Sequence, residues 1–197
     1  MMFIVFIGCG MLGVVTSHLV ADRALPPLPV YGHLTTYELI DQQGTRLTQA
    51  QLAGNVWIVD CMLTRCAGQC PMMSHQMQQL QQVFQSVPGV RLLSISVDPS
   101  HDTPEALRAY AQQYSAQVER WTFATGTRSA IDRLVREELH LGLAEGTSAA
   151  EPITHSTRLI LIDAHGQVRG YYEATDPSAV QRLIRDARRL GNTVRSS

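Results

Sequence analysis

The sequence predicts an α/β fold in which a central mixed sheet is flanked by helices and preceded by a hairpin. Nearly continuous apolar runs, typical of strands buried on both faces, alternate along the chain with segments of helical periodicity. Proline, glycine and Asp-Pro pairs separate these segments. Strands that alternate with helices indicate a parallel part of the sheet, and a hairpin late in the chain adds antiparallel strands.

The N-terminal hairpin is expected from two short segments, 37–40 and 46–48, that flank the polar turn Asp41 to Gly44. The first buried strand is expected at 56–62, where the run is almost entirely apolar. A helix should follow over 71–87, because proline at position 71 suits the first residue of a helix.

Later elements continue the alternation. The second buried strand is expected at 90–97, and Thr103 can cap a helix over 104–114 whose first residue is Pro104. The remaining expected elements are a short strand at 121–124, a helix at 127–139, a third buried strand at 157–162, its hairpin partner at 167–172 and a final helix at 177–190.

The chain divides into four parts. Residues 1–21 contain no charged side chain, and about 20 apolar residues suffice to span a bilayer. We expect them to form a transmembrane anchor, with a cleaved signal segment as the alternative. A Pro-rich linker at 22–35, the domain at 36–191 and a tail at 192–197 complete the chain. These segments predict export.

Charge and cysteine content narrow the class of protein. The formal net charge of −1 argues against a nucleic-acid partner, because such proteins carry strongly basic surfaces. Four cysteines are present. Cys9 lies in the apolar N-terminal segment, so Cys61, Cys66 and Cys70 remain as an odd, clustered set rather than a disulfide framework.

Cys66 and Cys70 lie on the predicted turn between the first buried strand and its helix. With Pro71 at the first helical position, Cys70 falls at or near the N-cap. Free N–H groups and the positive end of the helix dipole are expected there to lower the pKa of a thiol. The pair predicts a soft-metal or redox site, and a disulfide can form if the Cα atoms lie within about 7 Å. The alternative is two buried, inert cysteines.

His155 is the expected third donor. It follows a small-residue, loop-like stretch from Gly142 to Ala150 and directly precedes the third buried strand. A histidine after a flexible segment can swing onto the two thiols. Two thiolates and one imidazole form a soft set that suits Cu(I) and also accepts Cu(II), whereas structural zinc normally has a fourth protein ligand.

Four motifs follow one another over about residues 52–190. They are Cys66-x-x-x-Cys70-Pro71, Ser96-Val97-Asp98-Pro99-Ser100-His101-Asp102-Thr103-Pro104, Thr125-Gly126-Thr127, and His155-Ser156-Thr157 leading into Leu161-Ile162-Asp163. Together they resemble the Sco (SenC) family of membrane-anchored, thioredoxin-fold copper proteins that take part in assembling the CuA centre of cytochrome c oxidase. The expected location is therefore the bacterial inner membrane, with the soluble domain in the periplasm.

The resemblance implies a thioredoxin-like fold with Cys66, Cys70 and His155 as copper ligands. It also implies that Asp98 contacts the ligands without binding the metal itself, or positions a loop. An equal alternative is that Asp98 only forms the turn that leads into the next helix. This chain departs from the family in two places. Ala67 stands where proline commonly follows the first cysteine, and Thr154 stands where an acidic residue often precedes the histidine.

Further side chains near the motif have simpler interpretations. Cys61 could resolve a disulfide, but burial as a small apolar residue is the preferred interpretation. Met73 and Met77 lie one helical turn apart and should pack into the core, while Met72 and His75 could offer auxiliary ligands. His101 is expected at the surface.

The leading hypothesis is a copper metallochaperone whose acceptor is an oxidase subunit or another copper carrier. Because a disulfide would abolish binding, the site also needs a thiol reductant as a partner. The rival hypothesis is an enzyme, a thiol-disulfide oxidoreductase that keeps the cysteines of an oxidase subunit reduced or acts in redox defence. A redox sensor without metal is a third possibility. His155 separates the first two, since disulfide exchange does not require it.

Overall fold

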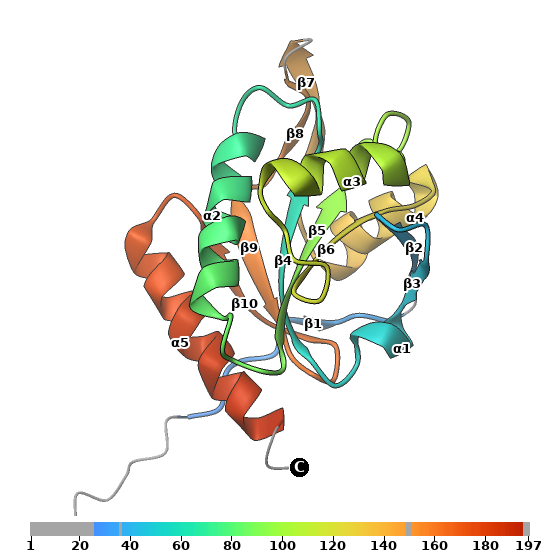
Figure 1. The fold of residues 1–197 in the computed structure, drawn as a ribbon. Coiled ribbons are helices and arrows are strands. Elements are labelled where there is room, and N and C mark those ends of the chain that lie inside the picture. Colours follow the sequence, from blue (N-terminus) through green and yellow to red (C-terminus); the bar gives the residue numbers. More distant parts are fainter. Residues whose placement is uncertain (1–25, 36, 149–150, 195–197) are drawn as a thin grey trace, which may run out of the picture.

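The computed structural model describes residues 26–35, 37–148 and 151–194, and for 143–148 and 151–155 it describes the backbone alone. An eight-stranded mixed sheet forms the centre, in the order β1-β10-β9-β4-β5-β6-β2-β3 (Figure 1). Its strands are β1 (Gly32–His33), β2 (Glu38–Asp41), β3 (Arg46–Thr48), β4 (Val56–Met62), β5 (Val90–Ser96), β6 (Trp121–Thr125), β9 (Arg158–Ile162) and β10 (Gln167–Glu173). The predicted α/β class and mixed sheet are confirmed.

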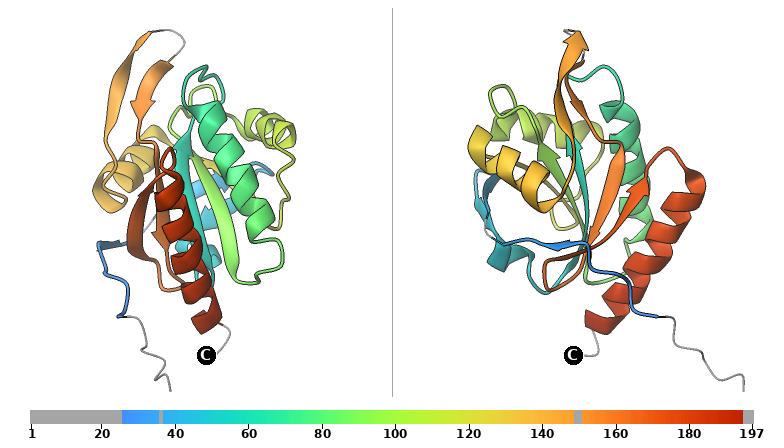
Figure 2. Two further views of the ribbon diagram at one scale, coloured as in Figure 1. Left: turned by 90° about the vertical axis from the view of Figure 1, so that its left-hand side faces the viewer. Right: turned by 180° about the vertical axis from the view of Figure 1, so that it is seen from behind.

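Five α-helices accompany the sheet in the described part of the chain. They are α1 (Gln49–Leu52), α2 (Cys70–Val83), α3 (Pro104–Gln113), α4 (Arg128–Arg133) and α5 (Pro177–Val194). Helices α2 and α3 cover one face of the sheet and α4 lies over the other, while α5 runs beside α2 and packs on β10 (Figures 1 and 2).

The pairing of the strands creates one edge at which connecting loops gather. Strands β4, β5 and β6 run parallel, so their carboxyl ends meet there, and β9 runs antiparallel to β4. All seven residues of β4 are buried, which explains why its sequence is a continuous apolar run. Ligand sites of such sheets form at the carboxyl ends of parallel strands.

Most predicted boundaries agree with the structure to within a few residues. The predicted cap of α3 is confirmed, because the Thr103 hydroxyl accepts a hydrogen bond from Ala106 N at 3.3 Å. Helix α2 ends at Val83 rather than Val87, and a turn closed by Val87 N and Phe84 O (2.9 Å) follows it. The helix expected over 127–139 is α-helical only to Arg133 and continues as a π-helical turn.

The prediction of a loop from Gly142 to Ala150 is wrong for 143–148, while 149 and 150 lie outside the described residues. A separate antiparallel hairpin occupies this region, formed by β7 (Leu143–Ser148) and β8 (Glu151–His155). The hairpin projects from the end of the molecule where α2 begins (Figures 1 and 2). Alanine, glycine and serine are poor strand formers, so the composition of this stretch resembled that of a loop.

The end of the expected linker lies on the domain. Tyr31 N donates to Val168 O at 2.9 Å, and Gly32 and His33 pair with β10. The side chain of Arg169 donates to the carbonyl oxygen of Pro29 at 3.0 Å. Within the described residues, no helix has the length and apolarity to cross a bilayer. The expected anchor at 1–21 lies outside the described residues.

Candidate metal centre

The loop after β4 carries both predicted thiols. Cys66 is 7% exposed and Cys70 is fully buried at the first position of α2. Gln69 takes the N-cap and Pro71 the second helical position, one residue later than predicted. The two thiols are in hydrogen-bonding contact. The loop therefore brings together two sulfur atoms, as the spacing Cys-x-x-x-Cys predicted.

The predicted lowering of the Cys70 pKa is wrong. Burial raises the pKa of the Cys70 thiol, and the backbone hydrogen bond from Leu63 offsets this only in part. The thiol contact with Cys66 and the charge of Asp60 raise the pKa further. Because desolvation of a thiolate in the core outweighs the helix dipole, Cys70 holds its proton at neutral pH.

Asp60 lies in the centre of β4 as a fully buried carboxyl group. Its Oδ1 accepts a hydrogen bond from Ser94 Oγ at 2.6 Å, and Oδ2 has no hydrogen-bond partner among the described residues. Burial raises the pKa of Asp60 to about 7, despite the opposing hydrogen bond from Ser94. Asp60 was not predicted from the sequence as a titratable group near the thiols. A single aspartate within an apolar strand belongs to no motif that would indicate a functional role.

Asp98 connects the loop after β5 to the cysteine loop. It is 2% exposed, and Arg65 Nε donates to its Oδ2 at 2.7 Å. Burial alone would raise the pKa of Asp98, but hydrogen bonds from Ser100, His101 and Arg65 outweigh burial and lower it. His101 is exposed, as predicted, although its ring contacts Asp98. The Asp98 carboxylate thus links the cysteine loop, through Arg65, to the loop after β5, through Ser100.

Asp102 was missed as a residue of the site. It is fully buried, and its carboxylate accepts hydrogen bonds from Thr64 and Ser96. The run Asp102-Thr103-Pro104 reads as a helix start, for which an exposed aspartate is ordinary. Only the packing of the loop after β5 against the cysteine loop shows its role.

The other soft side chains divide as predicted. Cys61 is fully buried, and Met73 and Met77 lie in the core. Met72 is 36% exposed on the first turn of α2. The ring of His75 contacts Tyr114, with 5.3 Å between ring centroids. Cys61, Cys66 and Cys70 are all in the thiol form, with no disulfide bond among them.

His155 ends β8, where its backbone pairs with Leu143. Its side chain lies outside the described residues. Two residues later the chain enters β9, which lies antiparallel beside β4 with Val59 opposite Ile160. The start of β9 is therefore directed toward the carboxyl end of β4. Among the side chains that the structure describes, no group of three potential ligands is assembled.

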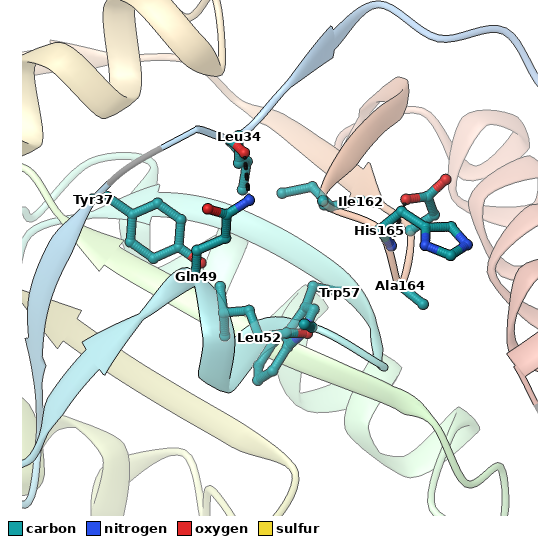
Figure 3. A pocket seen from close by; sticks show the side chains of 11 residues that line it. Leu34, Tyr37, Gln49, Leu52, Trp57, Ile162, Ala164 and His165 are labelled. Carbon is teal, nitrogen blue, oxygen red and sulfur yellow. Dashed lines mark hydrogen bonds between the residues drawn. The ribbon is translucent and has the colours of Figure 1, made fainter.

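A pocket of about 200 Å³ lies at the opposite end of the sheet (Figure 3). Trp57 at the start of β4 and Ile162 at the end of β9 line it, together with Tyr37 and Gln49. The Gln49 amide donates to Leu34 O at 2.8 Å. This pocket contains neither thiol, so it is separate from the candidate metal centre.

Comparisons with known proteins agree with this arrangement. The family model SCO1/SenC matches residues 31–190. A solved SCO1/SenC family lipoprotein from Bacillus anthracis is 29% identical, with a TM-score of 0.74 over 81% of this chain and 95% of that one. BsSco, described as a member of the Sco family of cytochrome c oxidase assembly proteins with a disulfide switch, is 24% identical, with a TM-score of 0.71 over 84% and 99%.

A further solved structure is that of Bradyrhizobium japonicum ScoI with copper bound. It is 20% identical, with a TM-score of 0.65 over 77% of this chain and 97% of that one. These likenesses agree with the predicted thioredoxin-like fold. Since the family model covers nearly the whole of the domain, this chain belongs to the SCO1/SenC family.

Proposed function

We propose that this protein is a copper metallochaperone that delivers copper for assembly of the CuA centre of cytochrome c oxidase. Cys66, Cys70 and His155 are the proposed ligands. The observation that carries the proposal is the contact between two buried thiols at the carboxyl end of β4, beside the strand that His155 precedes. The copper-bound ScoI structure and the family membership support copper as the ion.

The chemistry of the donors supports the same ion. Two neighbouring sulfur atoms can bind one soft metal, and an imidazole completes a three-coordinate set for Cu(I) or Cu(II). Few ligands leave the ion exchangeable, which delivery to an acceptor requires. We propose an oxidase subunit or another copper carrier as acceptor, and a thiol reductant that restores the dithiol after oxidation.

The proposed location is the bacterial inner membrane, with the domain in the periplasm. The lipoprotein nature of the Bacillus anthracis relative supports membrane attachment. We propose residues 1–21 as the anchor or signal segment, 22–35 as the linker, 36–191 as the copper-binding domain and 192–197 as a tail. The last residues of that linker pair with β10, so the connection between anchor and domain would be short.

A titration with Cu(I) in the presence of a competing chelator tests the proposal. The reduced protein should bind one equivalent, and Cys66→Ala, Cys70→Ala and His155→Ala should each weaken binding at least tenfold. Loading with Cu(II) should produce a thiolate charge-transfer band that both cysteine variants lack. His75→Ala is the matched control, because this histidine lies on α2 and its ring contacts Tyr114 at the end of α3. Absence of stoichiometric binding, or equal effects of the two histidine variants, would contradict the proposal.

The rival function is thiol-disulfide exchange, which the contact between the thiols and the disulfide switch of BsSco favour. It predicts that Cys70→Ala abolishes reduction of a test disulfide while His155→Ala leaves the rate unchanged. The raised pKa of Cys70 argues against it, because a protonated thiol is a poor nucleophile.

A further inference from the structure

A tight turn presents the first thiol of the proposed copper site. The turn spans Leu63 to Cys66 and is closed by a hydrogen bond from Cys66 N to Leu63 O at 3.3 Å. Thr64 and Arg65 are its two central residues. Whatever holds these two residues also determines where the Cys66 sulfur lies relative to Cys70.

The first central residue is held by Asp102, which is fully buried. The Asp102 carboxylate accepts hydrogen bonds from Thr64 N at 3.1 Å and from Thr64 Oγ1 at 2.5 Å. It also accepts one from Ser96 Oγ at 2.5 Å, at the end of β5. A buried carboxylate that accepts three hydrogen bonds, two of them short, is a rigid attachment, since breaking any of them leaves a desolvated charge without its partner.

The second central residue is held by Asp98, four residues earlier in the same loop. Arg65 Nε donates to Asp98 Oδ2 at 2.7 Å, and Asp98 N donates to Ser96 Oγ at 3.1 Å. The Arg65 side chain is 41% exposed, so this ion pair is partly screened by water. The attachment through Asp102 is therefore the stronger of the two.

We propose that Asp102, through Thr64, is a positioning residue that holds Cys66 against Cys70. This inference rests on the proposed function for its copper readout, while its redox readout is independent of copper. Both copper binding and disulfide formation require the two sulfurs to lie close together. Loosening the turn lowers the effective concentration of one sulfur at the other, so it weakens both reactions.

The experiment compares two variants of the attachment with two controls. Asp102→Asn removes the charge, and Thr64→Val removes the hydroxyl while keeping the shape of the side chain. Thr64→Ser is the first control, because serine keeps the hydroxyl group. Asp163→Asn is the matched control, because Asp163 is also buried and accepts hydrogen bonds from Gln167 N (3.0 Å) and Arg169 Nη1 (2.6 Å) at the opposite end of the sheet.

The redox readout is the equilibrium of the dithiol with glutathione. Oxidation forms one sulfur–sulfur bond between Cys66 and Cys70, and glutathione disulfide takes up the two electrons and two protons as it becomes two molecules of glutathione. Asp102→Asn and Thr64→Val should each disfavour the protein disulfide about tenfold, which for this two-electron couple is a shift of about 30 mV toward a less negative potential. Thr64→Ser and Asp163→Asn should change the equilibrium less than twofold.

The copper readout uses the same proteins. The dissociation constant for Cu(I) should rise about tenfold in Asp102→Asn and Thr64→Val, and remain within twofold in the two controls. If Asp102→Asn fails to fold, the potential and the Cu(I) dissociation constant of Thr64→Val test the inference. Unchanged potentials in both variants, or an equal shift in Asp163→Asn, would overturn the inference. If the parent protein binds no Cu(I), the proposed function fails, but the potentials still decide the role of Asp102.

Discussion

Asp60 and Cys70 lie close enough within the core for the ionised carboxylate to raise the pKa of the thiol. Asp60 also raises the pKa of the buried Cys61 thiol, in addition to the larger effect of burial. Three acidic groups thus share one desolvated region, and the ionised Asp60 carboxylate disfavours ionisation of both thiols. The site holds protons at neutral pH that binding of a cation would have to displace.

Stability should depend on pH through Asp60. Its pKa is about 7 in the folded protein and 3.8 as the ordinary value, so between these values the unfolded chain loses a proton that the folded chain retains. The free energy of unfolding should therefore fall as pH rises from about 4 to about 7, by on the order of 3 to 4 kcal/mol at most. Urea denaturation at several pH values measures this slope.

Asp60→Asn should flatten that slope and raise stability above pH 7 relative to the parent. The lowered pKa of Asp98 acts in the opposite direction, because its stabilisation is present above its ordinary pKa and is lost as pH falls through the lowered value. The pH range over which Asp98 affects stability is therefore more acidic than the range for Asp60. An unchanged slope in Asp60→Asn would show that the carboxyl group ionises normally.

Copper affinity should fall with decreasing pH. At the proposed site, binding requires the Cys70 thiolate, and the pKa of this thiol is raised by burial, so each metal ion bound there should displace at least the Cys70 proton. The apparent affinity for Cu(I) should drop by about tenfold or more for each pH unit between 8 and 6. Competition titrations at several pH values measure the slope, and a flat profile would mean that Cys70 is not a ligand.

Cys61→Ala should leave copper binding intact. Cys61 is fully buried in β4, where it pairs with Ile95 of the parallel strand β5. It therefore lies within the sheet and not in the loop that carries Cys66. Loss of a buried sulfur should cost about 1 to 2 kcal/mol of stability through the cavity that it leaves. Thermal unfolding and a copper titration check the two effects separately. Loss of copper stoichiometry would instead show that Cys61 takes part in the site.

Two adjacent methionines on α2 should behave differently on truncation. Met73 is fully buried, so Met73→Ala should lower the free energy of unfolding by about 2 to 5 kcal/mol. Met72 is 36% exposed, so Met72→Ala should change stability by less than about 0.5 kcal/mol. If Met72 helps to pass copper to an acceptor, its variant should slow transfer while the dissociation constant stays the same. Denaturation curves and a transfer assay distinguish these outcomes.

The sequence by itself determined the order of the main strands and helices, the mixed sheet and the position of the two thiols at the end of β4, but not the β7–β8 hairpin. Continuous apolar runs and capping residues such as Thr103 are local signals, because burial and helix initiation depend on neighbouring residues. The distinctive order of motifs also predicted the family, which the match over 31–190 confirms.

Only the tertiary structure decided how the site is supported and how the Cys70 thiol ionises. The pKa of Cys70 rises because the fold places this thiol in the core, where desolvation exceeds the helix dipole, and no local pattern reveals that depth. Likewise, Asp102 reaches Thr64 from 38 residues away. Such contacts arise when loops that follow neighbouring strands pack against each other. The local sequence around Asp102 or around Thr64 therefore cannot predict the contact between them.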